Sequence, residues 1–160
     1  MSTKPRLRRG GGKMVAGTGT AHRHSVLVLE DIADSREALK LLLESQGYRV
    51  AAAANGSEAL RTMQTFRPCV AIADIIMPTM DGLSFRQEML KCADIASIPV
   101  VALTGHEGLR RHALTEGFAA ALLKPARPEE LTALVAGHCA ESAESAEKPR
   151  STARSATQTR

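Results

Sequence analysis

Short apolar runs alternate with helix-like segments five times along the middle of the chain. The runs are mostly rich in Val, Ile and Leu, and continuous apolarity of this kind is typical of strands buried on both faces. They are Ser25–Leu29, Arg49–Ala53, Cys69–Ala73, Ile98–Leu103 and Ala120–Leu123. Strict strand-then-helix alternation predicts an α/β fold, a parallel sheet with helices on both sides.

Helical periodicity and start or stop signals mark the intervening segments. The first carries Leu39, Leu42 and Leu43 on one face, and Gly47 follows it as a stop signal. Pro128 suits the first turn of the last segment, and acidic residues follow it at the positive end of the helix. The predicted helices are 35–46, 57–66, 84–91, 107–116 and 128–138.

The ends of the chain differ in composition from its middle. The net charge of +4 divides into +6 for residues 1–24, −3 for 25–139 and +1 for 140–160. We expect residues 1–24 to be a disordered basic tail, 25–139 a folded domain, and 140–160 a brief helical extension followed by a disordered tail. Met14 is an alternative start, so the basic tail is either native or largely absent from the native protein.

The composition of the chain argues against several classes of protein. No apolar run approaches the roughly 18 residues that span a bilayer, and no apolar stretch follows the basic start, so we expect a cytoplasmic protein. The basic tail lacks aromatic or groove-reading patterns, so a solvated tail is favoured over nucleic-acid binding. Cys69, Cys92 and Cys139 have no paired or metal-type spacing, which predicts reduced thiols.

Polar residues follow four of the five predicted strands. They are Glu30 and Asp31 after the first strand, Asp74 after the third, Thr104 after the fourth, where Gly105 comes next, and Lys124 after the fifth. In open α/β sheets the functional crevice lies at the carboxyl ends of the strands. Three carboxylates, one hydroxyl and one ammonium are therefore expected at one edge of the sheet.

This set of groups suits phosphoryl transfer. Three adjacent carboxylates repel one another, and a divalent cation removes that repulsion. Few oxygen ligands from protein, with water completing the shell, favour Mg²⁺. With metal and Lys124 nearby, Asp74 stays ionised and can attack phosphorus. Lys124 and the Thr104 hydroxyl can then take oxygens of the transferred group.

The motifs SVLVLED, IADIIMPTMDG, VVALTG and LLKP, which begin at Ser25, Ile72, Val100 and Leu122, resemble the receiver domain of bacterial two-component response regulators. The resemblance covers about residues 25–139. It implies a flavodoxin-like (βα)₅ fold with strand order 2-1-3-4-5, dependence on Mg²⁺, and phosphotransfer from a histidine kinase or histidine phosphotransfer protein.

The resemblance also implies a role for each site residue. Asp74 is the phosphoacceptor. Asp31 binds Mg²⁺ directly, Glu30 acts through a water, and the backbone carbonyl of Ile76 completes the protein ligands. Thr104 and Lys124 contact the phosphoryl group, and the Lys124–Pro125 bond is cis.

Two positions depart from the family pattern. Ala121 stands where receivers commonly carry Tyr or Phe, three residues before the lysine. Phe118 lies three positions away, which would place it on the opposite face of a strand. Both features weaken the expectation that a Thr–aromatic pair transmits the signal. Ile76 places an apolar side chain two residues after the phosphoacceptor, where polar residues often influence water attack.

Because no output domain is recognisable, we expect a stand-alone regulator that signals through an unidentified partner protein or by phosphorelay. We do not expect an enzyme. A haloacid-dehalogenase-type phosphatase would need a second Asp where Ile76 stands. Gly10-Gly11-Gly12-Lys13 fails as a phosphate-binding loop, because Leu7 and Met14 replace required residues and no strand precedes it.

Overall fold

The computed structural model describes residues 24–147, and side chains as far as Glu144. Five parallel strands form one sheet in the order β2-β1-β3-β4-β5. The strands are β1 (Ser25–Leu29), β2 (Arg49–Ala53), β3 (Val70–Asp74), β4 (Val100–Thr104) and β5 (Ala120–Leu123). The predicted fold and strand order are confirmed. The predicted tails 1–23 and 148–160 lie outside the described residues.

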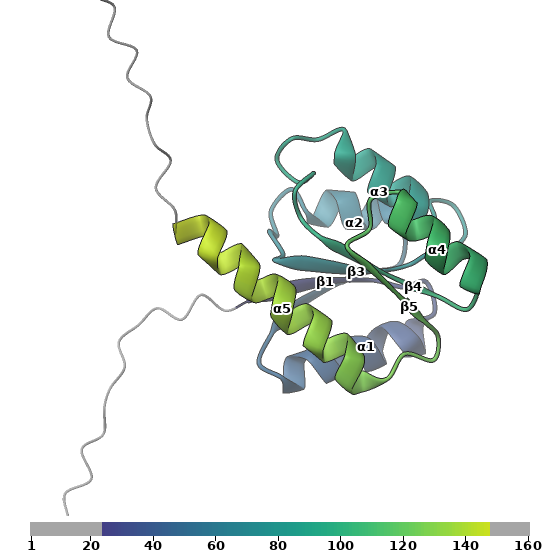
Figure 1. The fold of residues 1–160 in the computed structure, drawn as a ribbon, viewed down its shortest axis with the longest axis horizontal. Coiled ribbons are helices and arrows are strands. Elements are labelled where there is room, and N and C mark those ends of the chain that lie inside the picture. Colours follow the sequence, from purple (N-terminus) through teal and green to yellow (C-terminus); the bar gives the residue numbers. More distant parts are fainter. Residues whose placement is uncertain (1–23, 148–160) are drawn as a thin grey trace, which may run out of the picture.

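Five helices cover the sheet. They lie in two layers, one on each face (Figure 1). They are α1 (Ala33–Ser45), α2 (Gly56–Thr62), α3 (Gly82–Leu90), α4 (Glu107–Thr115) and α5 (Pro128–Glu147). Helices α1 and α5 lie on one face, and α2, α3 and α4 lie on the other. Helix α5 continues past Cys139, the expected last residue of the domain, and ends at Glu147.

Two apolar clusters join these layers to the sheet. In the α1–α5 cluster, Leu43 of α1 and Leu131 and Val135 of α5 pack with alternate residues of β1, β3 and β4. In the α2–α3–α4 cluster, Ala59, Phe85 and Ala113 pack from these three helices against the opposite face. Both faces of β1, β3 and β4 are therefore buried, which explains why these strands are apolar without alternation.

Side-chain caps fix where α2 and α3 begin, beside the carboxyl edge of the sheet. Asn55 caps α2 by accepting a hydrogen bond from the Glu58 backbone N–H at 2.9 Å. Asp81 caps α3 in the same way, accepting from the Ser84 N–H at 2.7 Å. These caps fix where each helix leaves the loop that follows its strand.

The expectation that all three cysteines are reduced thiols is wrong for two of them. The structure joins Cys69 and Cys139 as a disulfide, across 70 positions of the chain. Sequence spacing could not reveal this pair, because the two residues meet only when α5 packs beside the start of β3. Cys92 is free and exposed.

Phe118 also lies differently from the expectation. It precedes β5 rather than belonging to the strand, so strand alternation does not apply to it. Its side chain is buried in the α2–α3–α4 cluster, against which Ala121 also packs. The two residues therefore face the same layer.

Candidate functional site

The carboxyl ends of β1, β3, β4 and β5 bring the predicted polar residues to one edge of the sheet. Asp74 ends β3 and Thr104 ends β4, while Glu30 and Lys124 directly follow β1 and β5. Glu30, Asp74 and Thr104 are all buried. Parallel pairing places Asp74 beside Leu103 of β4, and Thr104 beside Leu123 of β5. The convergence expected from the strand order is present.

Lys124 links two of the carboxylates. Its Nζ donates to Asp74 Oδ2 at 2.7 Å and to Glu30 Oε2 at 2.8 Å. Partial burial alone would lower the pKa of Lys124, but the hydrogen bonds and charges of Asp74 and Glu30 together raise that pKa above its ordinary value. The ammonium therefore stays charged at neutral pH.

Backbone groups hold the two buried carboxylates in place. Asp74 Oδ1 accepts from the Ile76 N–H at 3.0 Å, and Glu30 Oε1 accepts from the Ile32 N–H at 3.2 Å. Each carboxylate thus has one oxygen on a backbone N–H and the other on Lys124. Their orientation is set before any ligand arrives.

Asp31 supplies a third carboxylate at the same place. Carboxylate oxygens of Glu30, Asp31 and Asp74 lie within 4.8 Å of one another. One ammonium cannot balance three carboxylates, so the set carries net negative charge. Hard carboxylate oxygens at this spacing suit Mg²⁺. The donor set therefore fits the predicted metal.

Arg36 is a supporting residue that sequence reasoning missed. Its guanidinium donates to the backbone carbonyls of Glu30 at 2.8 Å and Asp31 at 3.2 Å. It thereby ties the first turn of α1 to the acidic loop. An Arg on the first turn of the helix that follows an acidic pair is the signal that could have revealed it.

Thr104 and Ile76 are the remaining residues of the predicted site. The Thr104 hydroxyl accepts from the His106 N–H at 3.2 Å, and a Cβ added at Gly105 would meet open space. The Ile76 side chain is 53% exposed, so it lies at the rim of the site. An alkyl group there cannot act as the general acid that a dehalogenase-type phosphatase requires.

Replacing Lys124 with Met is expected to lower the free energy of unfolding of the metal-free protein by about 2 kcal/mol, because it leaves three carboxylates without a counter-charge. Since the pKa of Lys124 is raised, this contribution is present below its ordinary value of 10.5 and is lost as the pH rises through the folded-state value. Urea denaturation at neutral pH measures the loss.

The control for that variant is Lys91→Met, which removes the exposed Lys91–Glu88 pair on α3. Exposed pairs of this kind contribute about 0.5 kcal/mol. Equal losses in the two variants would show that Lys124 does not stabilise the acidic site.

A family model for the response regulator receiver domain matches residues 26–136. Response regulator Rre1 of Synechocystis sp. is 40% identical over 114 residues, which cover 69% of this chain and 49% of Rre1. The chain therefore spans about half the length of that relative. No helix among residues 24–147 is long and apolar enough to cross a membrane.

Solved structures agree with the family match. A putative response regulator from Chloroflexus aurantiacus has 29% identity and a TM-score of 0.69, with 73% of this chain and 98% of that chain covered. The receiver domain of sensor histidine kinase PA1611 from Pseudomonas aeruginosa, with magnesium in its active site cleft, has 28% identity, a TM-score of 0.68 and the same coverage. The chain belongs to the response regulator receiver domains, the phosphoacceptor domains of two-component signalling.

Proposed function

We propose that Asp74 is the phosphoacceptor of this receiver. The observation that carries the proposal is the bridge from Lys124 to Asp74 and Glu30, with the Asp31 carboxylate beside it. Asp74 is the carboxylate in this group that ends the central strand β3. Its two oxygens are already oriented by Lys124 and by the Ile76 N–H.

In the proposed reaction an Asp74 carboxylate oxygen attacks the phosphorus of a phosphohistidine. The P–N bond breaks, its electron pair returns to the imidazole, and an acyl phosphate forms on Asp74. Lys124 then pairs with a phosphoryl oxygen, and the Thr104 hydroxyl donates to another. The adjacent Gly105, with open space beside it, leaves room for the group to enter.

Mg²⁺ is the proposed cofactor, held by Asp31, Asp74 and the backbone carbonyl of Ile76, with Glu30 acting through a water. When bound it neutralises charge on the phosphoryl oxygens during transfer. The donor is a histidine kinase or a histidine phosphotransfer protein. The phosphorylated chain signals by binding a downstream protein or by relaying the group, and catalyses nothing beyond its own phosphorylation and dephosphorylation.

Incubation with Mg²⁺ and a small acyl phosphate is expected to add one phosphoryl group per chain. Excess chelator should abolish the addition, because one ammonium cannot offset three carboxylates when an anionic donor approaches. Asp31→Asn should raise the Mg²⁺ concentration needed for half-maximal labelling about tenfold or more. Intact-protein mass spectrometry measures labelling; unchanged labelling in chelator would contradict the metal assignment.

A further inference from the structure

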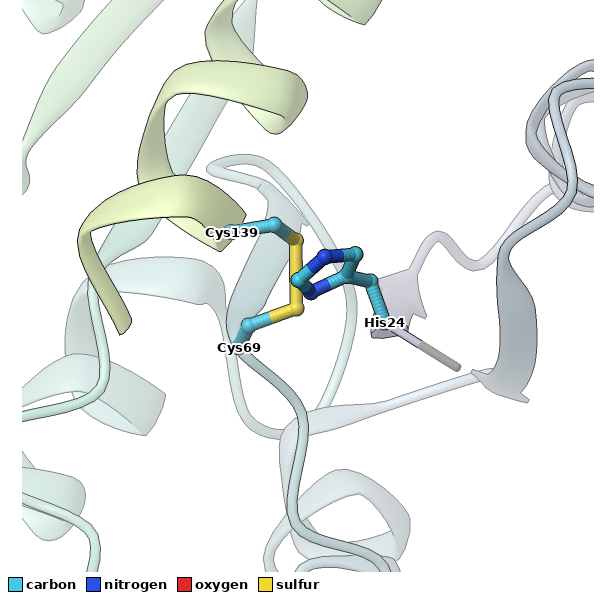
Figure 2. Close-up of side chains that lie close together, drawn as sticks. All are labelled: His24, Cys69 and Cys139. Carbon is cyan, nitrogen blue, oxygen red and sulfur yellow. A yellow bond between two sulfur atoms is a disulfide. The ribbon is translucent and has the colours of Figure 1, made fainter. Parts of the chain in front are cut away.

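The side chains of one histidine and two cysteines lie close together (Figure 2). They are at the amino ends of the strands, the edge of the sheet opposite Asp74. Cys69 lies directly before β3, Cys139 lies in α5, and His24 lies directly before β1. Their ligand-type atoms lie within 4.8 Å of one another. The two cysteine Cα atoms are 5.0 Å apart, a separation that disulfides accept without backbone movement.

The two sulfur-bearing residues differ in access to solvent. Cys139 is buried in the α1–α5 cluster, with 1% of its surface exposed. Cys69 is only half-buried and lines a surface groove of about 580 Å³, together with Arg67, Ser97 and His138. A small molecule in this groove therefore lies against Cys69, which is the more exposed residue of the disulfide.

The surroundings of Cys69 suit the reduced thiol as well as the disulfide. Cys69 Sγ lies 3.0 Å from the Ser25 carbonyl oxygen. A disulfide sulfur has no proton, so this contact becomes a hydrogen bond only when the disulfide is reduced. The Cys69 N–H also donates to Ser25 O at 2.8 Å, and this bond does not depend on oxidation state. The surroundings of Cys69 therefore accommodate both the disulfide and the reduced thiol.

We propose that Cys69 and Cys139 form a reversible thiol–disulfide site that exchanges with small thiols and controls how tightly α5 is held. A thiolate attacks Cys69 Sγ, the Sγ–Sγ bond breaks, and Cys139 leaves and takes a proton. The product is a mixed disulfide between Cys69 and the small molecule. A second thiolate attacks the small molecule's sulfur and releases Cys69, which takes up a proton and donates it to Ser25 O in a hydrogen bond. The balance is one protein disulfide and two thiols giving two cysteines and one small disulfide.

Thiol–disulfide exchange changes how α5 is attached to the start of β3. Leu131, Val135 and Cys139 form the buried stripe of α5, spaced four residues apart. The disulfide fixes the last of these to the start of β3. Beyond it, the Ser142 hydroxyl lies 2.9 Å from the His138 carbonyl of its own helix and 3.3 Å from the Cys69 carbonyl, and the second contact also depends on Cys69 staying beside α5. Reduction therefore loosens the C-terminal half of α5.

Glutathione buffers of varied redox poise test the proposal on the full chain carrying Cys92→Ser, which removes the exposed thiol. Maleimide labelling is expected to count no thiols in the oxidising buffer and two in the reducing buffer, reversibly. Hydrogen exchange of the amides of residues 137–144 is expected to accelerate about tenfold or more on reduction. Amides in β1 and β3 serve as the internal reference.

Cys69→Ser in the same background is the matched variant, because its hydroxyl can still donate to Ser25 O. It should show the fast exchange of α5 in both buffers. For the parent protein that carries Cys92→Ser alone, two reactive thiols in every buffer would overturn the proposal. Equal hydrogen exchange of residues 137–144 of that parent in the oxidising and reducing buffers would also overturn it. So would a reduced protein that binds one Zn²⁺ through His24, Cys69 and Cys139 and then fails to reoxidise, because the cluster would then be a metal site.

Discussion

Asp74→Asn is expected to abolish phosphoryl addition from a small acyl phosphate while leaving the fold intact. An amide has no anionic oxygen to attack phosphorus, and no other carboxylate of the group occupies the end of β3. Asn keeps the volume of Asp and can still accept from the Ile76 N–H at the position that Asp74 Oδ1 holds. The variant also removes one of three repelling charges, so no loss of stability from repulsion is expected.

The matched control for this variant is Asp34→Asn, on the exposed first turn of α1. It makes the same chemical change near the site without touching the bridged carboxylates. Intact-protein mass spectrometry should find one phosphoryl group on the control and none on Asp74→Asn. Equal labelling of both variants would exclude Asp74 as the acceptor.

Gly82→Ala is expected to destabilise the protein by about 3 kcal/mol or more. A Cβ added at Gly82 would overlap the backbone carbonyl oxygen of Asp74, and would also lie 3.1 Å from Ile75 Cα. Both obstacles are backbone, so no side-chain rotation relieves them. The Gly82 N–H also donates to the Ile75 carbonyl at 3.1 Å, which closes the loop after β3. Moving that loop would displace Asp74 and reduce phosphoryl addition as well.

The control for Gly82→Ala is Gly108→Ala, because a Cβ at Gly108 in α4 would meet nothing within 4 Å. Alanine favours a helix over glycine by up to about 1 kcal/mol, so this variant should be neutral or slightly stabilised. Urea denaturation compares the two. A loss for Gly82→Ala no larger than for the control would show that the close approach of α3 to Asp74 is not constrained by glycine.

The sequence predicts the sheet and the acidic edge well because both follow from local pattern and topology. Buried parallel strands must be apolar throughout, so β1, β3 and β4 are visible as unbroken runs. Once the strand order is known, Glu30, Asp74, Thr104 and Lys124 must meet, since each ends or follows a strand at the same edge. The structure adds the hydrogen bonds from Lys124 to Asp74 and Glu30, which agree with this prediction.

The features that the sequence does not predict depend on helix packing, on a strand boundary or on backbone acceptors, none of which a spacing rule encodes. The Cys69–Cys139 disulfide needs the packing angle of α5 beside β3, which no spacing rule encodes. Strand alternation gives the wrong face for Phe118 because this residue lies before β5, in the connection from α4, where that rule does not apply. The position of Arg36 after an acidic pair could have indicated a supporting role, but its acceptors are backbone carbonyls, which every residue has, so residue type does not identify them.

The most direct test of Asp74 as the acceptor is to locate the phosphoryl group on the chain. Protein incubated with Mg²⁺ and a small acyl phosphate is treated with borohydride, which reduces an acyl phosphate to an alcohol and so marks the modified carboxylate. Peptide mass spectrometry is expected to find the mark at Asp74 alone, and to find none when chelator is present. A mark at Glu30, Asp31 or any other carboxylate, with Asp74 unmodified, would contradict the assignment.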